Sequence, residues 1–148
     1  MRETSNTALV PYTAEQMFAL VEDFESYPQF VPWVTATRLL ERGSDFVVGQ
    51  LEMHRGPLHE TFTTRTVFIR PREITLSLIE GPFKTFEGRW SFIPLGDRGS
   101  KVGLAMRFEF ANAVLDVLLS RTFEKSCVEL VDAFVARARS LYGTREAN

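Results

Sequence analysis

The side chains that could carry out acid–base or metal chemistry are few in this chain. The two histidines, His54 and His59, flank the turn residues Gly56 and Pro57, so both are expected on an exposed hairpin loop. A metal site would need further His, Cys or carboxylate ligands at suitable geometry, and no such cluster appears. We therefore predict a surface pair, with acid–base chemistry in the loop as the alternative.

The single cysteine, Cys127, lies among apolar residues at helical spacing. Nothing nearby in the sequence would lower the pKa of its thiol, as a nucleophile requires. It is therefore predicted to be a small buried hydrophobe. One cysteine excludes an intramolecular disulfide and fits a reducing compartment.

The segment Gly96-Asp97-Arg98-Gly99-Ser100-Lys101 is only superficially similar to a phosphate-binding loop. Its residue order differs from the Walker motif, and a strand is expected after it where a helix would be needed. It is therefore predicted to be a hairpin turn. Two carboxylates, Glu52 and Glu80, could lie at the mouth of a cavity, but solvated side chains at strand ends are the simpler expectation.

Six cations could gather on the solvent side of a sheet, where RNA phosphates or lipid headgroups would bind. They are Arg65, Arg70, Arg72, Lys84, Arg89 and Arg107. Glu73, Glu87 and Glu109 are interleaved with them, so an ordinary mixed-charge surface is the simpler prediction. The formal net charge of −2 also argues weakly against bulk electrostatic binding to nucleic acid.

The strongest pattern is an amphipathic helix from Asn112 to Tyr142. Apolar residues recur there at three- and four-residue steps, as one face of a helix requires; they are Leu115, Leu118, Leu119, Phe123, Cys127, Leu130, Val131, Phe134, Ala138 and Leu141. Asn112 is expected to cap its start, and Gly143 to end it. At 1.5 Å per residue the helix is roughly 45 Å long, so its apolar face needs a long concave partner.

The middle of the chain supplies that partner. Six segments read as strands, at residues 35–42, 45–54, 59–69, 73–80, 84–95 and 101–110. The separators are short and rich in Gly and Pro, so the strands are expected to form an antiparallel meander. The last two segments alternate cleanly; their buried faces are predicted to carry Phe86, Gly88, Trp90, Phe92, Val102, Leu104, Met106, Phe108 and Phe110.

A further strand at 3–10 and two short helices after it complete one predicted α+β domain, residues 1–143, with a frayed tail at 144–148. Only the C-terminal helix is long enough to cover a curved, seven-stranded antiparallel sheet, so the predicted architecture is a helix-grip. Thirteen Phe side chains supply bulk without a hydrogen-bonding group. They either fill the interior as core or line a tunnel for an apolar ligand, and the sequence leaves both open.

We expect neither a signal peptide nor a membrane span in this sequence. The N-terminus lacks the apolar core of a signal peptide, and no run approaches the ~20 apolar residues of a membrane span. We therefore expect a cytoplasmic protein, with peripheral contact to the inner membrane through a surface patch left open.

Several blocks resemble the bacterial START-like family that contains RatA-type ribosome-association toxins and coenzyme Q-binding proteins. The blocks are residues 8–18, 25–32, 61–65, 81–84, 90–94, 108–110 and 133–138. They run in order over nearly the whole chain, and Tyr27-Pro28 and Gly81-Pro82-Phe83 are the most specific. The resemblance implies a helix-grip fold, in agreement with the residue patterns.

The family that the chain resembles has members with different functions. Its coenzyme Q-binding members imply a non-enzymatic carrier of ubiquinone or a similar prenyl lipid that supports respiration, with no required cofactor. We take this as the main hypothesis. The alternative is a ribosome-association toxin that binds the large ribosomal subunit and blocks subunit joining, and the second alternative is a polyketide cyclase-like enzyme, which no acid–base pair supports. The oligomeric state and any antitoxin partner stay open.

Under the carrier hypothesis, the predicted ligand-binding residues line a tunnel beneath the long helix. They are Tyr27, Phe30, Trp33, Phe83, Trp90, Phe110, Leu119 and Phe123. A quinone head could stack on an aromatic ring and accept a hydrogen bond from Tyr27, while its tail lies along the apolar stripe of the helix. No catalytic or metal-binding residue is expected.

Overall fold

The strands and helices follow the order that the sequence patterns predict. The computed structural model describes residues 1–143, so the predicted tail at 144–148 lies outside the described residues. The elements are β1 (Arg2–Val10), α1 (Ala14–Glu22), the 3-10 helix η1 (Phe24–Gln29), β2 (Val34–Arg42), β3 (Phe46–Arg55), β4 (Leu58–Ile69), β5 (Glu73–Glu80), β6 (Phe83–Leu95), β7 (Gly99–Phe110) and α2 (Ala113–Tyr142). Each predicted strand agrees with an observed one to within two residues at either end.

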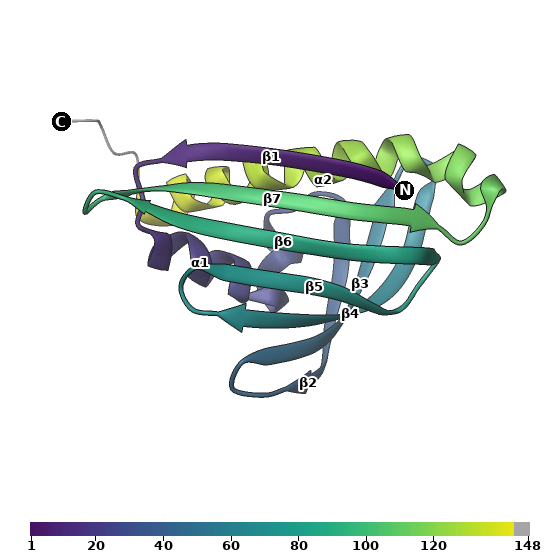
Figure 1. Cartoon of the computed structure of the whole chain (residues 1–148), viewed down its shortest axis with the longest axis horizontal. Helices are drawn as coiled ribbons and strands as arrows, with labels where there is room; N and C mark the ends of the chain where they lie inside the picture. Colours follow the sequence, from purple (N-terminus) through teal and green to yellow (C-terminus); the bar gives the residue numbers. More distant parts are fainter. Residues whose placement is uncertain (144–148) are drawn as a thin grey trace.

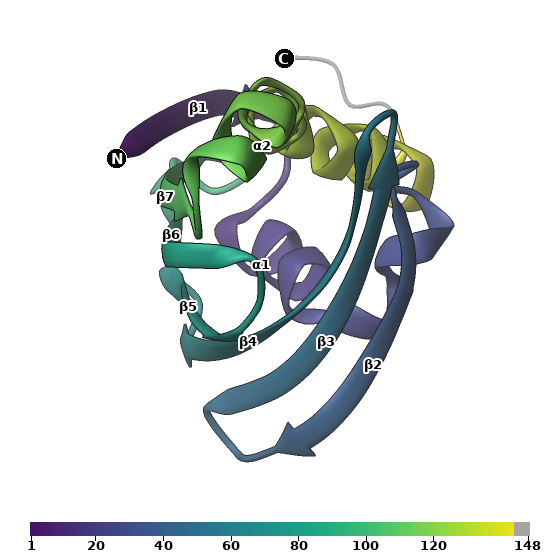
Figure 2. The ribbon, with the colours of Figure 1, turned by 90° about the vertical axis from the view of Figure 1, so that its right-hand side faces the viewer.

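The seven strands form one antiparallel sheet in the order β1-β7-β6-β5-β4-β3-β2. In Figure 1, α2 runs lengthwise along the β1 and β7 side of the sheet. Figure 2 shows the sheet curling so that β3 and β4 rise on the other side of α2, with α1 inside the curve. Register shifts interrupt the β2–β3, β4–β5 and β6–β7 ladders, and such bulges bend a sheet. The predicted helix-grip is confirmed.

Local sequence determines where both α-helices begin. Thr13 and Gln16 form a capping box at the start of α1, with bonds of 3.1 Å and 2.9 Å between each side chain and the other's backbone N–H. Asn112 caps α2 by accepting a 3.0 Å hydrogen bond from the N–H of Leu115. Gly143 ends α2 with a φ of 82°, which glycine adopts without strain.

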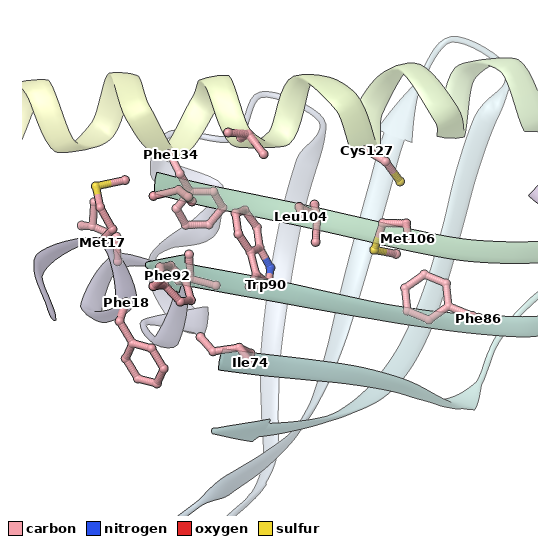
Figure 3. Close-up of a cluster of buried hydrophobic side chains, with 14 of the residues drawn as sticks. Met17, Phe18, Ile74, Phe86, Trp90, Phe92, Leu104, Met106, Cys127 and Phe134 are labelled. Atoms are coloured by element: carbon pink, nitrogen blue, oxygen red, sulfur yellow. The ribbon is translucent and has the colours of Figure 1, made fainter. Parts of the chain in front are cut away.

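The core lies between α2, α1 and the concave face of the sheet (Figure 3). The predicted inward residues of β6 and β7 are all buried, Trp90 and Phe92 among them. Phe134 of α2 is fully buried and meets Trp90 edge to face, with ring centroids 5.1 Å apart. Burial of this apolar area is what holds the helix in the curve of the sheet.

An ionic contact fastens the start of β1 to α2. Arg2 donates a 2.9 Å hydrogen bond to Asp116 and lies 3.4 Å from Glu124. Hydrogen bonds from Arg2 and Ser120 lower the pKa of Asp116 to about 2. Because these side chains are exposed, solvent screens the attraction, and the contact mainly positions the edge strand beside the helix.

The outer face of the sheet carries paired charges. Its ion pairs are Arg89–Glu73 at 2.8 Å, Arg107–Glu3 at 3.0 Å, Arg107–Glu87 at 3.3 Å and Lys84–Glu109 at 3.7 Å. Arg65 lies over the ring of Phe46 at 4.2 Å. The surface is therefore the mixed-charge surface that the interleaved glutamates predict. Within residues 1–143, no helix is both long and apolar enough to cross a membrane.

Candidate ligand cavity

A cavity of about 90 Å³ lies inside the curve of the sheet, beneath the middle of α2. One wall comes from β3 and β4, a second from α1 and η1, and the roof from residues 123–130 of α2. Trp90 and Phe86 of β6 and Met106 of β7 form the inner side, and Figure 3 shows them below Cys127. Nearly all lining side chains are apolar, so the cavity suits an apolar ligand.

The wall from β3 and β4 is built by strand alternation. Every second residue points inward, which gives Val47, Leu51 and Met53 on β3 and Phe62, Thr64, Thr66 and Phe68 on β4. The facing pairs Gly49–Thr64 and Val47–Thr66 are small. At Gly49 the ring of Phe24 takes the place of a side chain, with its nearest carbon 2.5 Å from where a Cβ would lie, so the open space is lined by Val47, Thr64 and Thr66.

Two threonine hydroxyls interrupt the apolar wall. Thr64 and Thr66 are both buried, and neither side chain makes a hydrogen bond to another described residue. Within residues 1–143, every polar side-chain atom that is shielded from solvent has a hydrogen-bond partner. Because the two hydroxyls have none, they are accessible to solvent, and both residues line the cavity. They are ready to bond a polar group of a ligand.

The hydroxyl of Tyr27 is already in use. It donates to the backbone carbonyl of Val21, and burial raises the pKa of Tyr27, so the phenol stays neutral. Tyr27 therefore lines the cavity with its ring, while the donor that was expected to meet a quinone carbonyl is bonded to the protein. Burial also raises the pKa of the Cys127 thiol, which agrees with a small hydrophobe and not with a nucleophile.

Four of the eight predicted ligand residues line the cavity: Tyr27, Trp33, Trp90 and Phe123. The other four lie elsewhere in the structure. Phe83 stacks on Phe110 at 4.7 Å between ring centroids, in a packed cluster beyond Phe123. Leu119 is buried one helical turn before Phe123. Phe30 packs edge to face on Phe134 at 5.0 Å.

The residues that the sequence reasoning missed are mainly those of β3 and β4. Their alternation from Val47 to Met53 and from Phe62 to Phe68 was a usable signal, since it marks a strand face that must point inward. The predicted set consists mainly of aromatic residues, whereas small and aliphatic side chains make up much of the cavity wall. The position of a residue along α2 also decides whether it lines the cavity, because only the middle of the helix lies over the cavity.

A contact between β3 and α2 lies beside the cavity. Arg55 pairs with Glu129 at 2.7 Å and donates a 3.2 Å hydrogen bond to the hydroxyl of Ser126. Its guanidinium lies 4.8 Å from the ring centre of Trp33, which lines the cavity. This contact holds the end of the β3–β4 hairpin against the helix.

The two histidines lie at that hairpin as predicted. His54 and His59 face each other across the strands with parallel rings 4.4 Å apart, and both are exposed. In residues 1–143 no group of three or more potential ligands could hold a metal ion. Glu22 is the one carboxylate lining the cavity in the same residues, and Arg70 pairs with it. The site therefore offers binding surface without an acid–base pair.

The chain is similar to a known protein family, to individual proteins of that kind and to solved structures. Residues 10–135 match the model of the polyketide cyclase / dehydrase and lipid transport family. The ribosome association toxin RatA of Escherichia coli K12 is 37% identical over 98% of this chain and 92% of its own length. The mitochondrial coenzyme Q-binding protein COQ10 homolog B of Xenopus laevis is 27% identical over 97% of this chain and 61% of its own length.

The Zhui aromatase/cyclase of Streptomyces sp. R1128 superposes on this structure with a TM-score of 0.85, over 97% of this chain and 99% of the other. Its sequence identity is 20%, so the likeness concerns the fold alone.

Proposed function

The chain belongs to the polyketide cyclase / dehydrase and lipid transport family, and within it to the RatA-type proteins. We propose that it binds an apolar small molecule without transforming it. The observation that carries the proposal is the cavity beneath α2, which is mainly apolar; its polar groups are two unbonded hydroxyls, the bonded hydroxyl of Ser126 and one paired carboxylate. Neither RatA nor the coenzyme Q-binding relative is named for a reaction.

The proposed ligand is ubiquinone or a similar prenyl lipid, and the protein needs no cofactor to bind it. The coenzyme Q-binding relative supports this ligand, although at 27% identity it is distant. A quinone ring is flat and carries two carbonyl acceptors, which the hydroxyls of Thr64 and Thr66 could meet. A cavity of about 90 Å³ is smaller than the ~300 Å³ of typical ligand sites, so binding requires the walls to move apart.

Tryptophan fluorescence provides the test, because Trp33 and Trp90 both line the cavity. Quinones should quench this emission, and affinity should rise with tail length until the space is full, each buried methylene adding roughly 0.8 kcal/mol before ordering costs. Mass spectrometry of organic extracts from the purified protein should find a bound prenyl lipid. Quenching that is absent, or that ignores tail length, would mean that the interior is only a core.

Ribosome association is the second candidate function, and the relatives favour it more directly than they favour quinone binding. RatA, with its 37% identity, carries this activity in its name. The proposal is that a surface of this chain contacts the large ribosomal subunit and hinders subunit joining. The paired charges on the outer sheet face make a purely phosphate-directed contact through that face a weak candidate.

Cosedimentation with purified large subunits tests this second candidate. If phosphates are contacted, binding should weaken steeply as salt rises. Charge reversal at Arg65, whose guanidinium has no carboxylate partner among the ion pairs of residues 1–143, should weaken it further. Failure to cosediment at low salt, with subunits free of other factors, removes the ribosome proposal and leaves the ligand proposal standing.

A cyclase-like reaction is the least supported candidate. Its support is the fold likeness to an aromatase/cyclase, and that likeness carries no reaction at 20% identity. A turnover assay with aromatic polyketide precursors should give no product above the uncatalysed rate.

A further inference from the structure

A second, polar recess adjoins the apolar cavity. It measures about 270 Å³ and shares Glu22, Val47 and Phe68 with the cavity. Its other walls come from the end of α1, the end of β2 and Arg70 after β4. The shared residues show that the two spaces are neighbours.

Arg70 lies at this boundary. Its guanidinium forms ion pairs with Glu22 and with Asp45, the latter at 3.5 Å, and donates a 3.0 Å hydrogen bond to the carbonyl of Ser44. It also lies 5.1 Å from the ring centre of Phe68. The Arg70 side chain therefore bridges the C-terminal end of α1 and the β2–β3 turn. Both partners of the Glu22–Arg70 pair are partly exposed, so the pair can open at little cost.

The charges of the recess are balanced. Its wall carries two guanidinium groups, Arg42 and Arg70, and two carboxylates, Glu22 and Asp23. Arg42 is further paired with Glu25 at 3.3 Å. An anionic head group would meet carboxylates as well as cations, whereas an uncharged head with carbonyl or hydroxyl groups finds donors without repulsion.

The polar residues on the inward face of β4 lie on the side of this recess. From Phe62 this face passes to Thr64 and Thr66, whose hydroxyls are open to the cavity, and then to Phe68 beside Arg70. The opposite end of the cavity is lined by the rings of Phe62, Phe86 and Phe123. The polar groups of the β4 wall therefore lie between this aromatic end and the recess, where Phe68 contacts Arg70.

We propose that the cavity and the recess together form one oriented site for an amphiphile with an uncharged polar head. The head enters the recess and accepts a hydrogen bond from Arg70 when the Glu22–Arg70 pair opens, and the apolar part points toward Phe86 and Phe123. This inference rests on the proposed ligand-binding function and adds the orientation, the class of head group and the residue that recognises it.

The test compares three probes with the same ten-carbon chain: a decyl benzoquinone with a neutral head, decyl sulfate with an anionic head, and decylbenzene with no polar head. Binding is measured by displacement of the neutral dye Nile red from the full chain. The wild-type protein should bind the quinone most tightly. Arg70→Ala should weaken quinone binding about tenfold, the worth of one hydrogen bond to a charged group, and leave decylbenzene binding unchanged.

Arg65→Ala is the matched control, because Arg65 lies on β4, the strand that ends just before Arg70, but packs against the ring of Phe46; it should leave all three affinities unchanged. Should Arg70→Ala fail to fold, Glu22→Gln removes the charge from one of the two carboxylates paired with Arg70 without loss of volume, which weakens that pair, and should strengthen quinone binding. Equal loss for the quinone and decylbenzene, no gain with Glu22→Gln, or tightest binding of decyl sulfate overturns the oriented site. Binding of decylbenzene in those cases leaves the proposed function intact, whereas no binding of any probe overturns both.

Discussion

The interior beneath α2 contains two regions that differ in how they are filled. The first, here called the closed cluster, consists of Phe83, Phe108, Phe110 and Leu119, which are buried and do not line the cavity. The second is the cavity wall of β3 and β4. Phe123 borders both, with its ring 4.7 Å from that of Phe108 and its edge at the cavity.

Cross-strand pairing explains the difference. In the β6–β7 ladder Phe83 faces Phe110, and their rings stack with centroids 4.7 Å apart. In the β3–β4 ladder the facing pairs are Gly49–Thr64 and Val47–Thr66, and the ring of Phe24 lies over Gly49. The interior beneath α2 is therefore filled where large rings face each other, and it leaves a cavity beside Val47, Thr64 and Thr66.

The largest effect is expected from a charge in the closed cluster. Leu119→Lys would bury an ammonium group without a partner and remove aliphatic packing, at a cost of about 5 kcal/mol or more, which is comparable to the whole stability of a small domain. We therefore expect the variant to unfold, as seen by circular dichroism. Leu118→Lys is the matched control, because Leu118 is 58% exposed and should tolerate the charge.

A folded Leu119→Lys protein that has lost ligand binding would contradict this comparison. It would mean that Leu119 faces the ligand, as the sequence reasoning expected.

The next largest effect distinguishes a filled region from a hollow one. Phe110→Ala should reduce the free energy of unfolding by about 3–5 kcal/mol, because a rigid cluster cannot collapse into the new void. Phe68→Ala should cost about 1–2 kcal/mol less, since one side of Phe68 already borders the cavity and has fewer contacts to lose. Denaturant titration measures both losses, and equal values would indicate that the β4 wall is as densely packed as the closed cluster.

The fold was predictable from the sequence because period, turn residues and caps all agreed. The alternation at 84–95 and 101–110 marks the inward faces of β6 and β7, and Asn112 and Gly143 mark the ends of α2. The site was only half predictable. Trp33 and Trp90 are predictable as large aromatic residues, but the space lies beside smaller residues such as Thr64 and Thr66, whose size has no visible consequence until the strands are paired.

The oriented polarity of the site also lay beyond the sequence. Arg70 is separated from Glu22 by 48 positions, and no local pattern relates them. Likewise, the bond of Tyr27 to Val21 follows from the turn between α1 and η1, which decides the direction of the hydroxyl.

A smaller effect is expected for the unbonded hydroxyls. Thr64→Val keeps the shape and removes a group without a protein partner, so the free energy of unfolding should change by about 0.5 kcal/mol or less. Binding of a quinone should nevertheless weaken several-fold, while decylbenzene is unaffected. Thr61→Val, on the exposed face of the same strand, is the control. A loss of stability well above 1 kcal/mol would show that the Thr64 hydroxyl serves the fold and not the cavity.

The smallest effect is expected at the β3–β4 hairpin beside the cavity. His54 and His59 stack on each other in solvent, and an exposed cross-strand pair contributes only a few tenths of a kcal/mol. Replacing both by Ala should leave thermal unfolding and quinone affinity nearly unchanged. Arg55→Ala, one residue from His54, should instead loosen ligand retention, because Arg55 joins the hairpin to Glu129 and Ser126. If the double histidine variant abolished a specific turnover, the hairpin would be an acid–base site and the protein an enzyme; if it behaved like Arg55→Ala, the stacked rings would be part of the closure of the cavity.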